Sequence, residues 1–288
     1  MHLGPRQLQH SLARAGLPAG ELTPVSGGSL PAFRLSRGGQ AWFIKVVPDA
    51  DMASAEADGL HALAKAPVQV PEVVHQSAMA DGAFLVLQWL TLRPVVAADE
   101  EAFGRCLAAL HRLTGPHYGW HRDNWIGLGR QHNSPADDWA VFFRDQRLAP
   151  QLRRARAAGL PADVAGEVEW VMQRIHAWLD HAPTPVLVHG DLWSGNRAMA
   201  GDRPALFDPA VYYGDSLVDL AMLHLFGGPG AAFWPAYTAL NPVDGKRFRR
   251  VQPLYDLYHW LNHFTIFGDS YLTPIQRCCA ALRRELRG

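Results

Sequence analysis

The chain has 288 residues, of which 48% are hydrophobic and 19% are charged, and its 27 Lys and Arg side chains are balanced by 27 Asp and Glu side chains. This balance gives no support for binding to nucleic acid or to a membrane surface, and the apolar stretches fall short of the roughly 20 residues that a membrane helix needs. Three cysteines without a CxxC motif argue against a disulfide framework, so we expect a reduced, cytoplasmic setting.

The first ninety residues alternate between helical and strand-like character. Residues 1–17 are amphipathic, without the apolar core of a signal peptide, and residues 51–66 are rich in alanine and end before Pro67, so both segments predict helices. Short runs rich in β-branched and aromatic residues predict strands at 22–25, 32–35 and 41–47. The apolar run at 83–90 fits a strand or a buried helix.

The rest of the chain is mostly helical in character. Periodic segments predict helices at 99–113, 137–158, 163–181, 216–226, 247–267 and 274–286. Two short apolar runs, 185–188 and 204–207, interrupt them, and each leads into a polar cluster. We therefore predict an α+β protein with a strand-rich N-terminal lobe (residues 1–90) and a larger helical C-terminal lobe (residues 91–288).

The strongest chemical signal is HGDLWSGN at residues 189–196, which contains Asp191 and Asn196 and is followed by Asp208 after the next apolar run. Phosphate transfer from ATP needs a carboxylate near the attacking hydroxyl and oxygen ligands that hold Mg²⁺ against the phosphates. Asp191 suits the first task, and Asn196 with Asp208 suits the second. The five-residue step from Asp191 to Asn196 also separates Asp and Asn in the protein-kinase catalytic loop. This favours an ATP- and Mg²⁺-dependent kinase over a polar loop with a structural histidine.

A lysine inside an apolar strand gives a second signal. Lys45 lies in the run at 42–47, where a charge is costly unless it is paired, and Glu56 follows in the next predicted helix. In kinases a strand lysine contacts the ATP phosphates and pairs with a helix glutamate. Gly27 and Gly28 lie between two predicted strands, where backbone N–H groups can approach phosphates. An exposed strand lysine and a plain hairpin turn are the alternative interpretations.

Five sequence blocks resemble the fructosamine kinase family. They are GWHRDN at 119–124, HGDLWSGN at 189–196, FDPAVYYGD at 207–215, DLAM at 219–222 and LYHWLNH at 257–263. The resemblance implies a protein-kinase-like bilobal fold and transfer of the ATP γ-phosphate to a sugar hydroxyl of a ketosamine, the adduct of a sugar and an amine. In fructosamine the acceptor would be the 3-hydroxyl. Phosphorylation there destabilises the adduct, so the implied role is deglycation.

The resemblance also assigns roles to individual residues. Asp191 becomes the catalytic base, Asn196 and Asp208 the Mg²⁺ ligands, and Lys45 with Glu56 the pair that holds the phosphates. The remaining nucleotide-side residues are Gly27, Gly28 and the hinge residues Gln88, Trp89 and Leu90, and the acceptor-side residues are Trp120, His121, Asp123, Asn124, Trp193, Tyr212 and His259. Asp219 is expected to be structural and to bond the backbone of the catalytic loop.

Alternative interpretations concern the acceptor and the activity. A kinase acting on an aminoglycoside, choline or another sugar derivative would share this catalytic core. An inactive pseudokinase would be expected to have lost Asp191, Asn196, Asp208 or Lys45, and all four are present. We expect the partner to be a ketosamine, either small or protein-linked. The histidine pairs spaced by four residues, at 117 and 121 and at 259 and 263, are expected to be structural or substrate-contacting rather than metal ligands.

Overall fold

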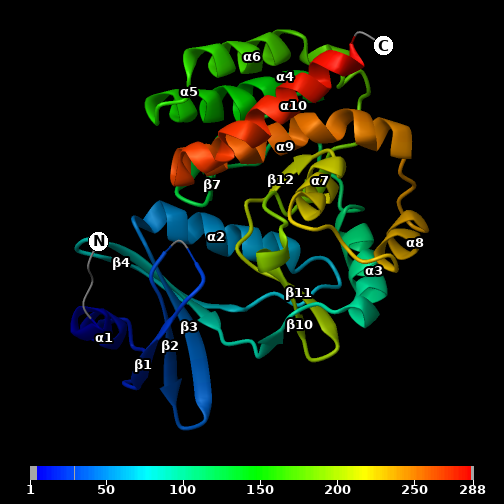
Figure 1. The fold of residues 1–288 in the computed structure, drawn as a ribbon. Helices are drawn as coiled ribbons and strands as arrows, with labels where there is room; N and C mark the ends of the chain where they lie inside the picture. Colours follow the sequence, from blue (N-terminus) through cyan, green and yellow to red (C-terminus); the bar gives the residue numbers. More distant parts are fainter. Residues whose placement is uncertain (1–4, 29, 287–288) are drawn as a thin grey trace.

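The computed structural model describes residues 5–28 and 30–286 and has two lobes that differ in secondary structure (Figure 1). Residues 1–4 of the predicted first helix lie outside the described part of the chain, as does Ser29 in the glycine-containing turn. The N-terminal lobe is built on a five-stranded antiparallel sheet in the order β1-β2-β3-β5-β4. Its elements are α1 (Pro5–Arg14), β1 (Glu21–Val25), β2 (Ala32–Arg37), β3 (Gln40–Val47), α2 (Ala50–Leu63), β4 (Val73–Met79) and β5 (Gly82–Gln88).

The two faces of this sheet are covered by different helices. Successive side chains of a strand point to opposite faces, so Ile44 and Val46 of β3 face one way and Lys45 faces the other. Ile44 and Val46 share a buried cluster with Leu8 and Leu12 of α1. On the opposite face, Val47, Leu85 and Leu87 pack against Met52, Ala57 and Leu60 of α2. The alternation therefore places Lys45 on the face that carries α2.

The C-terminal lobe is mainly helical and holds the larger hydrophobic core. Its helices are α3 (Glu100–Leu110), α4 (Trp139–Phe142), α5 (Ala149–Ala157), α6 (Ala162–Gln173), α7 (Leu217–Leu225), α8 (Phe233–Thr238), α9 (Gly245–Phe267) and α10 (Leu272–Glu285), with a π-helical turn at Phe143–Leu148 and 3₁₀ turns at Ala97–Asp99, Ile175–Ala177, Ser194–Asn196 and Asp269–Tyr271. The long helix α9 contacts α5, α7 and α10 (Figure 1). It therefore forms the centre of the lobe.

Short strands position the polar loops of this lobe. They are β6 (Leu92–Arg93), β7 (Asn124–Ile126), β8 (Gly129–Gln131), β9 (Val186–Val188), β10 (Arg197–Ala200), β11 (Arg203–Leu206) and β12 (Tyr212–Gly214). Strand β9 pairs with β12, and β10 pairs with both β11 and β6. These ladders bring the loop at 189–196 beside the loop that follows β11. Because β6 already pairs with a strand of the helical lobe, we propose that the lobe boundary lies at about residue 90.

The structure confirms the predicted α+β class, with the small antiparallel sheet first and the helical lobe second. The run at 83–90 is a strand, β5, rather than a buried helix. The helix predicted at 137–158 is interrupted by the π-helical turn, and the one predicted at 163–181 already ends at Gln173. Strands β4, β6, β7, β8, β10 and β12 and helix α8 were not predicted. None of the described helices combines the length and apolar character that crossing a membrane requires.

Candidate active site

The loop that carries Asp191 is anchored from below by Asp219. The backbone N–H groups of His189 and Gly190 donate to Asp219 Oδ2 and Oδ1 over 2.7 and 2.9 Å, and His111 Nε2 lies 3.1 Å from Oδ2. Burial acts to raise the pKa of Asp219, but the hydrogen bonds and charges of these partners outweigh it and lower the pKa, so the carboxylate stays ionised. The prediction that Asp219 bonds the loop backbone is confirmed.

The turn at the start of this loop requires glycine. Gly190 has a φ of +81°, and a Cβ atom at this position would lie 2.1 Å from the carbonyl oxygen of Ala210. His189 is fully buried and bridges the turn, because its Nδ1 accepts from the Asp191 N–H over 3.3 Å while its Nε2 lies 3.0 Å from the carbonyl oxygen of Phe207. These contacts assign the proton to Nε2. His189 is therefore a structural residue that joins the loops of Asp191 and Asp208.

Asp191 and Asn196 face each other across the loop. Asn196 Nδ2 donates to the carbonyl oxygen of Asp191 over 2.9 Å and contacts its Oδ2 at 3.3 Å. Because both contacts use Nδ2, the Oδ1 atom of Asn196 stays available as a ligand. Burial and the nearby charge of Asp208 raise the pKa of Asp191 to about 7. A carboxylate with a pKa near neutrality is suited to accept a proton under ordinary conditions.

A lysine from the sheet joins the two lobes at the same place. Lys45 Nζ lies 2.8 Å from Glu56 Oε2 on α2 and 2.9 Å from Asp208 Oδ1 in the loop after β11. Burial acts to lower the pKa of Lys45, but the charges of both carboxylates raise it, so the lysine stays protonated. The Glu56 side chain is only 8% exposed, whereas that of Asp208 is 44% exposed. Asp208 therefore keeps an accessible carboxylate beside the lysine.

Asp208 itself adopts an unusual backbone conformation. Its φ of +55° is the one positive value found at a non-glycine position among the described residues. Left-handed backbone costs an ordinary side chain about 1–3 kcal/mol and is tolerated best by Asn and Asp. The conformation turns the Asp208 carboxylate towards Lys45, so local strain accompanies the contact between the lobes.

Two parts of the N-terminal lobe were predicted to contact the nucleotide, the glycine turn and the hinge at residues 88–90. Gly27, with a φ of +115°, and Gly28 lie in the turn between β1 and β2, and Ala32 at the end of that turn pairs with Lys45. At the hinge, the Gln88 side chain accepts from the Glu72 N–H over 3.5 Å, so it turns towards β4. Trp89 packs 6.4 Å from the ring of Phe43 and lies under Arg34 at 4.9 Å.

The GWHRDN block lies along α2 and makes contacts that the sequence did not reveal. Trp120 Nε1 donates to Asp58 Oδ2 over 2.6 Å, and His121 Nε2 lies 3.3 Å from the other oxygen of Asp58. Arg122 reaches Ser54 Oγ over 2.9 Å near the start of the same helix. Together these side chains clamp α2, the helix that carries Glu56, onto the helical lobe. His121 remains 60% exposed and is the member of the block most open to a ligand.

Four further acceptor-side candidates have protein partners or lie in the core. Asp123 accepts from Arg130, His132 and the Asn133 N–H, and the buried Asn124 donates to the carbonyl oxygen of Val211. Tyr212 is buried 3.9 Å beneath the guanidinium of Arg147, and His259 is buried on α9 with a pKa that burial lowers to about 3. A substrate would reach Tyr212 or His259 only if the core opened. Their acceptor-side roles stay predictions.

Trp193, by contrast, lies at the surface of the catalytic loop. Its side chain is 36% exposed and stacks edge-on against Phe226, with ring centroids 5.9 Å apart. A Cβ atom on Gly195 would lie 2.2 Å from the Trp193 ring, so the loop needs glycine there to accommodate the indole. Trp193 is therefore held in place two residues beyond Asp191.

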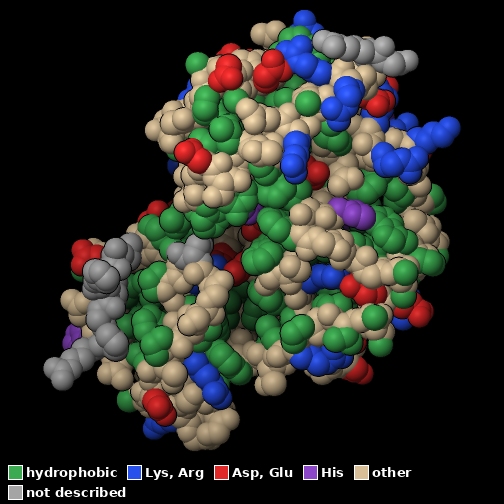
Figure 2. Space-filling view, in the orientation of Figure 1, with side chains coloured by type: hydrophobic (Ala, Val, Ile, Leu, Met, Phe, Trp, Pro, Cys, Tyr) green, Lys and Arg blue, Asp and Glu red, His purple; other side chains and the backbone are tan. Residues whose placement is uncertain are grey.

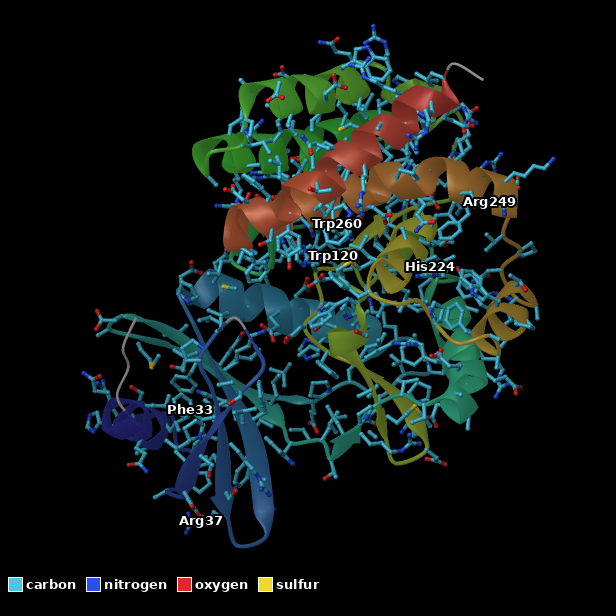
Figure 3. All side chains as sticks on the ribbon, in the orientation of Figure 1. Phe33, Arg37, Trp120, His224, Arg249 and Trp260 are labelled. Carbon is cyan, nitrogen blue, oxygen red and sulfur yellow. The ribbon has the colours of Figure 1, made fainter. Side chains whose placement is uncertain are left out.

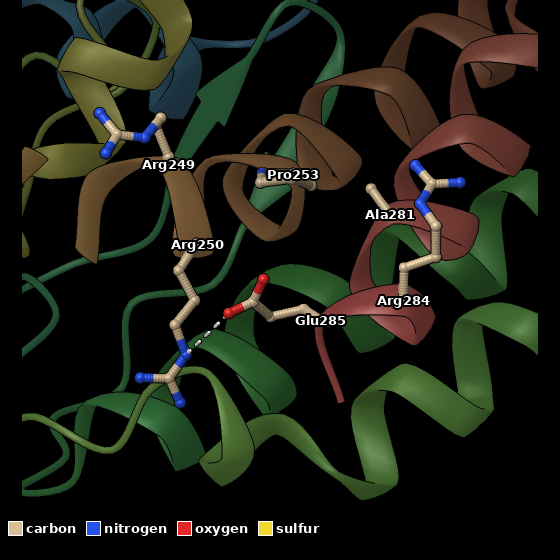
Figure 4. Close-up of a pocket in the computed structure, with 6 residues that line it drawn as sticks. All are labelled: Arg249, Arg250, Pro253, Ala281, Arg284 and Glu285. Carbon is tan, nitrogen blue, oxygen red and sulfur yellow. Dashed lines mark ion pairs between the residues drawn. The ribbon is translucent and has the colours of Figure 1, made fainter. Parts of the chain in front are cut away.

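The molecule is hollowed between the lobes, and charged side chains are visible inside the hollow (Figure 2). A separate hollow lies on the outside of the helical lobe, between α9 and α10 (Figure 4). Its lining residues are Arg249, Arg250, Pro253, Ala281, Arg284 and Glu285, with Arg250 Nε 4.0 Å from Glu285 Oε1. This outer hollow contains none of the predicted site residues, and we assign it no role.

The site thus combines a strand lysine paired with a helix glutamate, a loop that carries Asp191 and Asn196, and a second aspartate, Asp208. This combination defines a kinase with a protein-kinase-like fold. The fold agrees with that of the aminoglycoside phosphotransferase APH(4)-Ia, with a TM-score of 0.68 at 17% identity over 99% of this chain and all of that one. The chain belongs to the fructosamine kinase family, whose sequence profile matches residues 6–285.

Two relatives illustrate the family match. A protein of Synechocystis named as a probable ketoamine kinase is 42% identical over 265 residues, which cover 89% of this chain and 88% of the relative. The crystal structure of a candidate fructosamine-3-kinase from Haemophilus somnus aligns with a TM-score of 0.87 at 27% identity, over 96% of this chain and 97% of that one. The similarity thus extends over both lobes.

Proposed function

We propose that this chain is an ATP-dependent kinase that phosphorylates a sugar hydroxyl of ketosamines and so initiates their deglycation. Membership of the fructosamine kinase family supports the reaction and the substrate class. The observation that carries the proposal is the position of Lys45, which contacts Glu56 in one lobe and Asp208 in the other while Asp191 stands on the neighbouring loop. This arrangement supplies the groups that phosphate transfer requires.

The nucleotide would lie between the lobes. Lys45, held by Glu56, would contact the phosphates, and the turn at Gly27 and Gly28 would offer backbone N–H groups from above. Residues 88–90 would border the adenine, with main-chain groups making the contacts because the Gln88 side chain is turned towards Glu72. The positive charge of Lys45 would offset the negative charge of the phosphates.

The donor set at the lobe junction fits Mg²⁺. Asn196 presents a free amide oxygen and Asp208 an accessible carboxylate, and Mg²⁺ prefers such oxygen ligands together with phosphate and water. Among the described residues no cluster of three His, Cys, Asp or Glu side chains is arranged to hold a metal ion, so the phosphates would supply the remaining ligands. Mg²⁺ bound in this way would neutralise charge on the phosphates.

Asp191 would orient the sugar hydroxyl and accept its proton as the oxygen bonds to the γ-phosphorus and the bond to ADP breaks. Asn196 holds the Asp191 loop in register with the proposed metal site, since its amide donates to the Asp191 carbonyl. The exposed Trp193 would cover an apolar face of the sugar. The acceptor therefore has to approach from the side of the helical lobe.

The test is ATP consumption by the purified protein with Mg²⁺ against fructosamines, ribulosamines, aminoglycosides, choline and simple sugars, with Asp191→Asn as the matched inactive control. We expect turnover on ketosamines alone, with phosphate on the sugar by ³¹P NMR. Turnover on an aminoglycoside or choline instead would contradict the substrate assignment and leave the kinase chemistry in place. ATP binding without turnover on any acceptor would indicate an inactive nucleotide-binding module.

A further inference from the structure

A strip of aromatic side chains begins beside Asp191 and runs along the helical lobe. The strip consists of Trp193, Phe226, Trp260, His263, Phe267 and Tyr271. The ring centroids of Trp193 and Phe226 are 5.9 Å apart, those of Phe226 and His263 are 5.5 Å apart, and those of His263 and Phe267 are 5.7 Å apart. Trp260 lies 5.8 Å from Phe226, and Tyr271 lies 5.1 Å from His263. Neighbouring rings are thus in contact over the whole strip.

Three separate segments build the strip. Trp193 belongs to the catalytic loop, and Phe226 caps the end of α7. On α9, Trp260, His263 and Phe267 are spaced by three and four residues, which places them on one helical face. Tyr271 follows in the 3₁₀ turn. The strip is thus continuous with the loop of Asp191 although its members are distant in sequence.

The strip is open to solvent on one side and supported on the other. Phe267 is 59% exposed, and Trp193 and Phe226 are 36% and 37% exposed, whereas Trp260 and Tyr271 are partly buried against the core of the lobe. Figure 3 labels Trp260, which lies on α9. Burial lowers the pKa of His263, so the strip is uncharged at neutral pH.

We propose that the part of this strip beyond Trp193, from Phe226 to Tyr271, binds the apolar group attached to the ketosamine nitrogen, so that the preferred acceptors are adducts of amines with aromatic or long alkyl substituents. This inference rests on the proposed function and specifies its substrate class. The nitrogen of a ketosamine is only a few bonds from the hydroxyl that would receive phosphate at Asp191. Trp193 is two residues further along the same loop and contacts Phe226, so an amine half that points along the loop would extend onto the strip.

The chemistry of the strip fits this occupant. The nitrogen of a ketosamine is a secondary amine that is protonated at neutral pH, and cations are attracted to aromatic faces. The substituent beyond the nitrogen gains by leaving water when it covers exposed rings. None of the strip's six side chains carries a charge that would favour an acidic or basic substituent at neutral pH.

The test compares two fructosyl adducts that differ only in the amine, phenethylamine against ethanolamine, in steady-state kinetics with saturating ATP. We expect the wild-type KM to be about tenfold lower for the phenethylamine adduct, the effect of burying part of an aromatic ring. Phe226→Ala and Phe267→Ala should each lose most of this preference. Leu240→Ala is the matched control, because Leu240 is 43% exposed in the turn after α8 and lies outside the strip, and it should keep the preference.

The possible outcomes separate this inference from the proposed function. Equal KM values for the two adducts in the wild type, or a preference that survives both phenylalanine substitutions, would overturn the strip as a substrate site while leaving the kinase intact. Phosphorylation of neither adduct would remove the proposed function and this inference with it. If Phe267→Ala abolishes self-association in sedimentation and leaves both KM values unchanged, the strip is an interface between two copies of the chain, and the inference is wrong.

Discussion

Replacing Asp219 with alanine removes the acceptor of two backbone N–H groups at the start of the loop that carries Asp191. Both groups, on His189 and Gly190, are buried, and no water can replace the carboxylate without entering the core. A buried donor left without a partner costs about 1–3 kcal/mol, and a hydrogen bond to a charged group contributes about as much. We therefore expect Asp219→Ala to lower the free energy of unfolding by about 3–5 kcal/mol and to reduce kcat, because the Asp191 loop loses its anchor.

The matched control is Asp244→Ala. Asp244 also accepts from two backbone N–H groups, those of Lys246 and Arg247 at the start of α9, but these are exposed to water. Its loss should cost about 1 kcal/mol and leave kcat unchanged. Urea denaturation measures the stabilities, and hydrogen exchange at residues 189 and 190 reports on the loop directly. The reasoning is refuted if Asp219→Ala costs no more than Asp244→Ala, or if exchange at those two amides stays as slow as in the wild type.

Three further predictions concern the nucleotide side and the reaction itself. Lys45→Met removes the proposed contact with the phosphates and leaves Glu56 unpaired, so kcat/KM for ATP should fall about 10²-fold or more in a coupled ADP-release assay. A loss below threefold would contradict the role of Lys45. Gly190→Ala places a Cβ atom against the Ala210 carbonyl oxygen and should destabilise the catalytic loop. We expect loss of turnover and a lower melting temperature, and a variant with wild-type turnover would contradict the turn geometry. Asp191 can accept a proton only when it is ionised, so its raised pKa predicts that kcat/KM falls as pH decreases through about 7. A profile that stays flat from pH 8 to pH 5 would exclude Asp191 as the group that accepts the proton.

The catalytic groups were predictable because short-range spacing encodes them. Asp191 and Asn196 lie on one loop, and Asp208 ends the next hairpin, so the order of elements brings them together whatever the rest of the fold does. Lys45 could be identified because a charge inside an apolar strand requires a partner, and the structure shows that it has two, Glu56 and Asp208. The ion pair with Asp208 joins residues 163 positions apart, which no local pattern reveals.

The acceptor side was less accessible to sequence reasoning. Residues of the GWHRDN block were expected on the substrate side, yet Trp120 and Arg122 bond to Asp58 and Ser54 on α2, because tertiary contacts between distant segments leave no periodic signal. The π-helical turn at Phe143–Leu148 could not be predicted either, because the sequence on both sides of it keeps the ordinary helical pattern. The aromatic strip unites three segments that are distant in sequence, and it was not predicted from the sequence.

The measurement that tests the central claim most directly is phosphate transfer from ATP to a fructosamine by Asp191→Asn beside the wild type, with ATP affinity determined calorimetrically for both. The account predicts that the variant binds ATP as the wild type does, since Lys45, Glu56 and Asp208 are untouched, while transfer falls by about 10²–10⁴-fold. Loss of ATP affinity with turnover close to that of the wild type would contradict the assignment of Asp191 as the group that accepts the proton.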